Sequence, residues 1–127
     1  MTNETREALV LLKAQLAACE EAVLRFAALR NALCQSASGG GLTDPTAALE
    51  HSLREVGALA RRQDALLETM QGTSLTEIIA REPNLTERFA VERVLRAVTA
   101  RQRELRERMQ SCTELLNASA AFVSYQL

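Results

Sequence analysis

Few residues in this chain of 127 combine types and spacing that could support metal binding. The single histidine, His51, has the carboxylates Glu50 and Glu55 as neighbours, so a metal ligand set can be imagined there. Metal sites built on histidine usually include a second histidine or a cysteine, and the sequence places neither near His51. We therefore expect His51 to be a solvated helix residue and expect no metal site.

The three cysteines, Cys19, Cys34 and Cys112, are an odd number and show no Cys-x-x-Cys spacing. In a cytosolic chain this pattern argues against a disulfide framework and against a zinc site. Cys19 and Cys112 fall on helical stripes of apolar residues, where a cysteine behaves as a small buried apolar side chain. We expect them to be structural.

The sequence also lacks the motifs of nucleophilic catalysis and phosphate binding. The run Gly39 to Gly41 follows no strand and precedes no Lys-Ser or Lys-Thr pair, so it does not match a phosphate-binding loop. One histidine supplies no Ser-His-Asp or Cys-His set. An active site needs a pocket with convergent polar groups, and the carboxylates are scattered on predicted helix exteriors. We expect a protein that is not an enzyme and needs no cofactor.

Composition favours helices that pack along narrow apolar stripes. Apolar residues make up 47% of the chain and aromatic residues only 3%, which suits thin helix–helix contacts better than a β-sandwich. The net charge of −1 gives no steering toward nucleic acid or anionic membranes. No window resembles a membrane span, and Met1 to Glu7 lacks a signal-peptide layout. We expect a cytoplasmic protein without membrane insertion.

Apolar residues recur at alternating spacings of three and four along three long segments, as in bundles and coiled coils. This spacing predicts helices at about residues 3–35, 45–71 and 85–125. Asp44 and Pro45 suit the N-cap and first position of the second helix, and Gly72 suits its C′ position. The predicted stripes are Leu9, Leu12, Leu16, Cys19, Val23, Phe26, Arg30 (which breaks the apolar series) and Leu33; then Leu49, Leu53, Val56, Ala60, Gln63, Leu67 and Met70; then Val91, Leu95, Val98, Gln102, Leu105, Met109, Cys112, Leu116, Ser119 and Val123.

A short helix is predicted at about residues 75–81, between the second and third long helices. Ser74 and Glu77 form a capping-box pattern at its start, Pro83 stops it, and Asn84 caps the next helix. These elements predict an all-α fold: an antiparallel bundle or coiled coil of three long helices plus one short helix, forming a single helical domain over residues 1–127. The residues expected to close one end of the bundle are Leu75, Ile78 and Ile79.

The last predicted helix is rich in arginine but also carries acidic residues. Glu92 with Arg96, and Glu104 with Arg108, are i,i+4 pairs in the favourable order. Interleaved acids and the lack of stacking aromatics argue against a phosphate-binding face. We therefore expect a salt-bridged, solvated surface and no nucleic-acid partner. From Ser111 to the end of the chain, Glu114 is the only charged residue.

This plan resembles the FlgN family of flagellar export chaperones, small cytosolic proteins in which long antiparallel helices flank a short central helix. The resemblance covers nearly the whole chain. It rests on the leucine-rich stripe of the first helix, on the passage from Gly72 to Ile79, and on the stretch from Leu115 to Val123. Two features depart from the family: the loop from Ser36 to Gly41 is glycine-rich, and Lys13 is the only lysine.

The resemblance implies a type III secretion chaperone for the hook–filament junction proteins, which are hook-associated proteins. Such a chaperone binds the C-terminal helices of its substrates, keeps them unassembled and delivers them to the flagellar export apparatus. Substrate helices would lie along the last helix in a helix-in-groove mode, and Tyr125 would contact the export apparatus. The residues assigned to substrate binding are Leu105, Met109, Cys112, Leu116, Phe122 and Val123.

Other interpretations stay open at this point. The six residues assigned to substrate binding could instead pack against the first helix as intramolecular core. The chain could form a homodimer or a larger homo-oligomeric coiled-coil scaffold, or it could be another helical type III secretion chaperone. A helical-bundle enzyme or sensor is the weakest alternative, because no catalytic residues support it.

Overall fold

The computed structural model describes the backbone of residues 1–35 and 43–126 and the side chains of residues 1–35 and 44–111. Four helices make up this part of the chain: α1 (Asn3–Gln35), α2 (Thr43–Thr69), α3 (Leu75–Ala80) and α4 (Leu85–Gln126). The described residues contain no strand. The predicted all-α fold of three long helices and one short helix is therefore confirmed.

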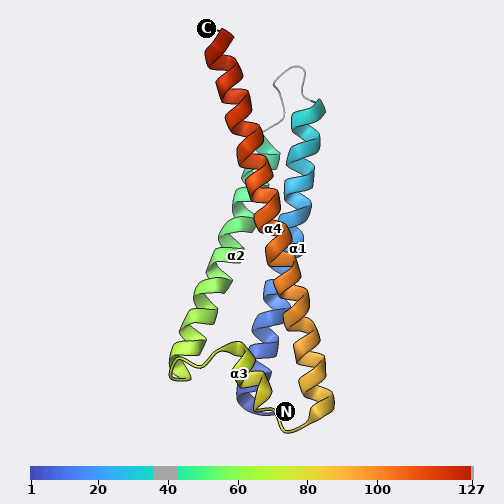
Figure 1. The fold of residues 1–127 in the computed structure, drawn as a ribbon, viewed down its shortest axis with the longest axis vertical. Coiled ribbons are helices and arrows are strands. Elements are labelled where there is room, and N and C mark those ends of the chain that lie inside the picture. Colours follow the sequence, from blue (N-terminus) through green and yellow to red (C-terminus); the bar gives the residue numbers. More distant parts are fainter. Residues whose placement is uncertain (36–42, 127) are drawn as a thin grey trace.

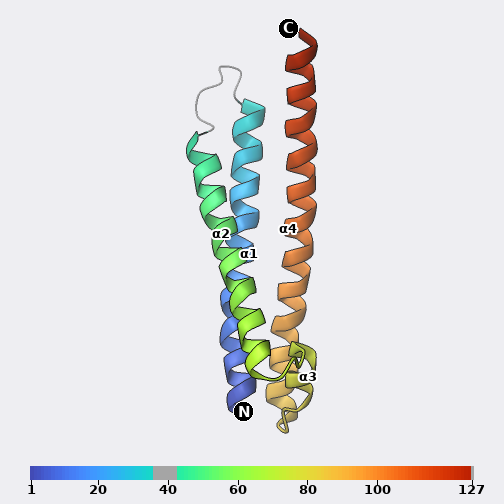
Figure 2. The ribbon, with the colours of Figure 1, turned by 90° about the vertical axis from the view of Figure 1, so that its left-hand side faces the viewer.

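The central helix is α1, because α2 and α4 each pack along it (Figure 1). The short helix α3 packs against both α1 and α4. α1 and α4 run in the same direction and α2 runs in the opposite direction, so the two chain ends lie at opposite ends of an elongated molecule (Figure 1, Figure 2).

Two neighbours give α1 a wider buried surface than one stripe could predict. Leu12, Cys19 and Phe26 are buried, as expected, but Leu9 and Leu16 of the same stripe are only half-buried. The physical reason is that α2 and α4 both pack along α1, so more than one stripe of α1 is covered. Buried residues of α1 that the stripe omitted are Thr5, Ala8, Leu11, Gln15, Ala18, Ala22 and Leu29.

Three groups of buried apolar residues lie along α1: the second follows the first, and the third lies beside both. The first core group joins α1, α3 and α4, and the second joins α1, α2 and α4. The third lies between α1 and α2. The first comprises Ala8, Leu12, Leu75, Ile78, Ile79, Val91 and Val98; the second comprises Cys19, Ala22, Phe26, Leu29, Leu49 and Leu105; the third comprises Leu11, Ala18 and Leu59.

The expectation that α3 closes one end of the bundle is confirmed. Ile78 and Ile79 are almost fully buried in the first core group. Removing an isoleucine side chain from water stabilises a fold by about 1.5–3 kcal/mol, so a helix of only six residues can be held firmly. The Oγ of Ser74 accepts a hydrogen bond from the N–H of Glu77 (3.1 Å), which confirms Ser74 as the N-cap.

α4 also begins as predicted. The Oδ1 of Asn84 accepts a hydrogen bond from the N–H of Glu87 (3.1 Å), as an N-cap side chain does. α2 differs slightly, because it begins at Thr43 and Asp44 therefore lies in its first turn rather than at the cap. A carboxylate in that turn still interacts favourably with the helix dipole. Ala60, predicted to lie in the α2 stripe, is exposed, whereas Leu59 beside it is buried.

One buried polar contact links α1 to α2. The Nε2 of Gln15 donates a hydrogen bond to the Oε1 of Gln63 at 2.8 Å. Gln15 is buried and Gln63 is half-buried. A single polar pair inside an apolar contact favours the register that allows it to form. This pair therefore helps to align α2 along α1.

The end of α2 corrects one prediction: Gln71, and not Gly72, occupies the C′ position. The N–H of Gly72 donates to the carbonyl of Leu67 (3.0 Å), and the N–H of Gln71 donates to that of Glu68 (3.1 Å). These two bonds define a Schellman motif with Gln71 at C′ and Gly72 at C″. Both residues have positive φ, 60° for Gln71 and 77° for Gly72.

Replacing Gln71 by glycine is therefore expected to raise the free energy of unfolding by about 0.5–1 kcal/mol. A left-handed conformation costs an ordinary residue about 1–2 kcal/mol, and part of the gain is lost because glycine is more flexible in the unfolded chain. Gly72→Ala is the matched control, and it is expected to lower the free energy of unfolding. No atom lies within 4 Å of the added Cβ, so only backbone strain acts. Urea unfolding followed by circular dichroism measures the stability of both variants. A Gln71→Gly variant that is less stable than the unchanged chain would contradict the assignment of Gln71 to the C′ position.

Candidate functional site

α4 carries every residue that the sequence assigned to substrate binding, and the packing around α3 fixes where α4 begins. Glu82, in the turn between α3 and α4, has a fully buried side chain. Its carboxylate accepts hydrogen bonds from the backbone N–H groups of Thr2 (2.9 Å) and Asn84 (3.4 Å). Glu82 therefore ties the start of α1 to the start of α4.

Hydrogen bonding keeps Glu82 charged despite its burial. The N–H of Thr2 lowers the pKa of the Glu82 carboxyl most strongly, burial opposes this, and the bond from Asn84 lowers the pKa further. The amino group of Met1 lies 3.8 Å from Glu82 and 2.8 Å from the Glu87 carboxylate. Sequence reasoning missed this contact, because nothing in the local sequence distinguishes Glu82 from a solvated glutamate.

The two assigned residues with described side chains have different environments. Leu105 is 5% exposed and belongs to the second core group. It therefore packs within the bundle, in agreement with the alternative interpretation that these residues form intramolecular core. Met109, one turn further along α4, is 42% exposed. α4 therefore passes from a buried position to a surface position between these two residues. The backbone of the remaining assigned residues lies in α4, but their side chains lie outside the described residues: Cys112, Leu116, Phe122, Val123 and Tyr125.

The C-terminal turns of α4 extend past the neighbouring helix. In Figure 2 the end of α4 reaches beyond the end of α1, and no other described helix lies beside it there. This end lies within the part of the sequence that carries Glu114 as its only charged residue after Gln110. The described helices therefore leave the end of α4 without a neighbour.

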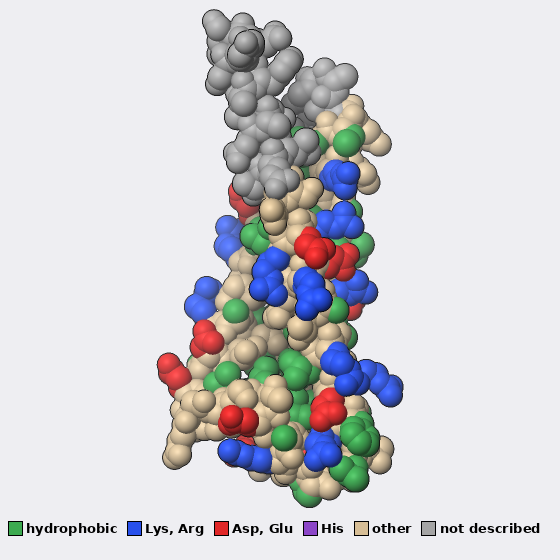
Figure 3. Space-filling view, in the orientation of Figure 1, with side chains coloured by type: hydrophobic (Ala, Val, Ile, Leu, Met, Phe, Trp, Pro, Cys, Tyr) green, Lys and Arg blue, Asp and Glu red, His purple; other side chains and the backbone are tan. Residues whose placement is uncertain are grey.

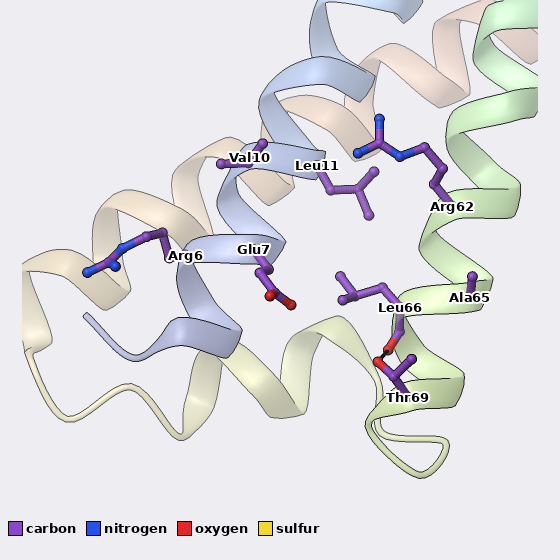
Figure 4. Close-up of a pocket in the computed structure, with 8 residues that line it drawn as sticks. All are labelled: Arg6, Glu7, Val10, Leu11, Arg62, Ala65, Leu66 and Thr69. Carbon is purple, nitrogen blue, oxygen red and sulfur yellow. Dashed lines mark hydrogen bonds between the residues drawn. The ribbon is translucent and has the colours of Figure 1, made fainter.

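A second surface, a groove between α1 and α2, was not expected from the sequence. It has a volume of about 700 Å³ and is open to solvent (Figure 4). Val10 and Leu11 of α1, with Ala65 and Leu66 of α2, form its apolar part. Val10 is 60% exposed. The polar residues around it are Arg6, Glu7, Arg62 and Thr69.

The run from Val10 to Leu12 contained a signal for this groove. Three consecutive apolar residues cannot all lie on one narrow helical stripe, so α1 had to present apolar side chains on more than one face. Leu12 points into the first core group and Leu11 into the third, which leaves Val10 at the surface. The groove is lined by apolar and polar side chains in equal number, and its lining residues do not form a catalytic set.

The residues considered for metal binding or thiol chemistry lie apart in the structure. Among the described residues no group of three or more His, Cys, Asp or Glu side chains is arranged to hold a metal ion. His51 is exposed. Cys19 lies in the second core group, where burial raises the pKa of its thiol, and Cys34 is exposed.

The ion pairs of α4 correct part of the predicted pattern. The predicted Glu104–Arg108 pair is present at 4.0 Å. Glu92 pairs with Arg88 at 3.9 Å instead of with Arg96. A glutamate in a helix lies one turn from residues on both sides, so the spacing alone could not select between them.

No described helix is both long enough and apolar enough to cross a membrane. Comparison with known proteins identified no matching family model, no matching curated protein and no matching solved structure. Function is therefore inferred from the residues of this chain and their geometry.

Proposed function

We propose that this protein is an export chaperone that binds amphipathic helices of partner proteins along the C-terminal part of α4. The observation that supports this proposal is the extension of α4 beyond α1, with no other described helix beside it (Figure 2). A nearly uncharged helix that leaves its own bundle is suited to pack against a helix from another protein. Binding, and not catalysis, is the proposed activity.

The step from Leu105 to Met109 supports the same assignment. Leu105 faces the second core group, and Met109 is largely exposed although it continues the same stripe of α4. An exposed methionine adapts to irregular partner surfaces because its side chain is unbranched and flexible. We therefore place the start of the binding surface at Met109 and its continuation toward the end of α4.

The resemblance to the FlgN family supports a specific set of partners. We propose that they are the C-terminal helices of flagellar hook–filament junction proteins, which the protein keeps unassembled in the cytoplasm. Delivery to the flagellar export apparatus would follow, with Tyr125 as a contact to that apparatus. Cys112, Leu116, Phe122 and Val123 would extend the substrate surface that begins at Met109.

The substitution Met109→Glu tests this proposal. The variant is expected to bind a purified junction protein at least tenfold more weakly than the unchanged chain, because a charge would enter the apolar contact; tenfold corresponds to about 1.4 kcal/mol. Leu24→Glu is the matched control, since Leu24 is also an exposed large apolar residue but lies on α1. Isothermal titration calorimetry measures both affinities, and circular dichroism checks that both variants stay helical.

Truncation after Met109 extends the test to the end of α4. The shortened chain is expected to lose substrate binding while the residues from Leu9 to Met70 stay helical. If it binds a junction protein as tightly as the full chain, the assignment of the surface to α4 is wrong. Sedimentation of the protein alone addresses the scaffold alternative: a stable oligomer over a wide concentration range would favour a homo-oligomeric scaffold.

A further inference from the structure

We infer that the outer face of α4 near its start is a second binding surface, which takes an acidic amphipathic helix of a partner protein. This Arg face consists of Leu85, Phe89, Arg93, Arg96 and Arg103. It lies in the first half of α4, before the surface proposed above begins at Met109, and shares no residue with it. The inference therefore goes beyond the proposed function and does not depend on it.

The apolar part of the Arg face is a pair of exposed side chains. Leu85 is 55% exposed and Phe89 is 54% exposed, and they lie one turn apart on the same side of α4. The guanidinium of Arg88 lies 5.7 Å from the centre of the Phe89 ring. Exposed aromatic and aliphatic pairs of this kind serve as anchors in protein–protein contacts.

The basic part of the Arg face continues directly from this pair. Arg96 follows Phe89 by seven residues and Arg103 follows Arg96 by seven, so all three share one side of the helix. Arg93, Arg96 and Arg103 are exposed, and none forms an ion pair with a described residue. Figure 3 shows hydrophobic side chains at the lower end of this face of the molecule, with Lys or Arg side chains, and some Asp or Glu side chains, beside and above them.

Of the acidic residues on this side of α4, Glu92 and Glu104 are already paired with other arginines, and Glu107 lies one turn beyond Arg103, past the end of the Arg face. Glu92 lies between Phe89 and Arg96, but its carboxylate is 3.9 Å from Arg88. Glu104 is engaged by Arg101 at 2.8 Å and by Arg108 at 4.0 Å. Three guanidinium groups are therefore left available along a face about 21 Å long, measured from Phe89 to Arg103 at the rise of an α-helix.

The positive charge of the Arg face favours a partner helix that carries carboxylates. Guanidinium groups pair with carboxylates in a two-pronged geometry, so a helix with acidic residues at a two-turn spacing matches Arg96 and Arg103. An apolar residue near one end of that helix would contact Leu85 and Phe89. Single-stranded nucleic acid is the less suitable ligand, because binding it usually needs several stacking aromatics in succession and this face offers Phe89 alone.

A designed peptide tests the Arg face in the full-length protein. The probe is a fluorescein-labelled helical peptide with glutamates two turns apart and a Leu-Phe pair near one end; a matched peptide carries Gln in place of each Glu. We expect the acidic peptide to bind at low salt, measured by fluorescence anisotropy. The double variant Arg96→Glu, Arg103→Glu should weaken this binding at least tenfold, and Phe89→Ala at least threefold.

Control variants and competing ligands test whether the acidic peptide binds specifically to the Arg face. The double variant Arg54→Glu, Arg61→Glu changes the net charge equally on exposed positions of α2 and should leave the affinity unchanged, as should Met109→Glu. The inference is overturned if the acidic peptide does not bind, if the Gln peptide binds as tightly, or if the α2 variant is equally impaired. Tighter binding of a single-stranded oligonucleotide of equal charge, with displacement of the peptide, would assign the face to nucleic acid instead.

Discussion

Replacing Leu12 by alanine is expected to lower the free energy of unfolding by about 3–4 kcal/mol, within the range measured when a buried leucine is truncated. Leu12 is fully buried in the first core group, where it meets α3 residues such as Ile78 and α4 residues such as Val91. The variant would lose the transfer energy of the removed atoms and leave a cavity between three helices. Since small domains are stable by only about 5–15 kcal/mol, this is a large part of the total.

Val10→Ala provides the control on the same helix. Val10 is 60% exposed and lies only two residues before Leu12, so its truncation is expected to change stability by less than about 0.5 kcal/mol. Urea unfolding followed by circular dichroism at 222 nm, a standard helix signal, compares the two variants. A loss below about 1 kcal/mol for Leu12→Ala would mean that α3 does not close over α1 as the structure describes.

Glu82→Gln is expected to destabilise the protein at neutral pH and to change how its stability depends on acid. The buried carboxylate accepts hydrogen bonds from the N–H groups of Thr2 and Asn84, which hold its pKa below the ordinary value of 4.5. A neutral amide accepts such bonds less strongly than a carboxylate does, and its NH₂ group would need a new acceptor. The link between the start of α1 and the start of α4 would therefore weaken.

The sign of the pH effect follows from the direction of the pKa shift. Because folding lowers the pKa of Glu82, its charge stabilises the fold fully above the unfolded-state pKa near 4.5, and this contribution is lost as the pH falls through the lower folded-state pKa. The stability difference between the unchanged chain and Glu82→Gln should thus be largest near neutral pH. It should shrink as the pH is lowered below about 4.5.

A matched glutamate separates this effect from general charge removal. Glu50 is exposed in the interior of α2, and Glu50→Gln should leave both the stability at pH 7 and the acid profile close to those of the unchanged chain. Thermal unfolding at a series of pH values between 3 and 7 would measure all three proteins. If the profiles of Glu82→Gln and the unchanged chain stay parallel over this range, the buried carboxylate does not have the role assigned to it.

The sequence by itself determined the elements whose causes are local. Ser74 and Asn84 cap their helices because each side-chain oxygen reaches an N–H three residues further along the chain. Pro83 cannot continue α3, and the apolar spacing of Leu75, Ile78 and Ile79 directs one face of that short helix inward. These interactions span less than two helical turns, so the order of residues was sufficient to predict them.

Only the tertiary structure decided how many neighbours each helix has. A period of 3.6 residues shows that a helix has an apolar face, but it does not show whether one helix or two cover that face. This is why Ala8 and Gln15 are buried although the predicted stripe of α1 omitted them. It is also why Leu105 lies in the core while Met109, on the same stripe of α4, lies at the surface.

Long-range polar contacts also could not be predicted from the sequence. Glu82 accepts a hydrogen bond from the N–H of Thr2, which is 80 residues away in the sequence. Neither residue has a local sequence feature that indicates this contact. The choice between Gln71 and Gly72 at the end of α2 likewise depended on where the chain had to turn toward α3. For the proposed binding surface, the sequence located a nearly uncharged stretch, and the fold placed the end of that stretch beyond α1, because α4 is longer than the helix it packs against.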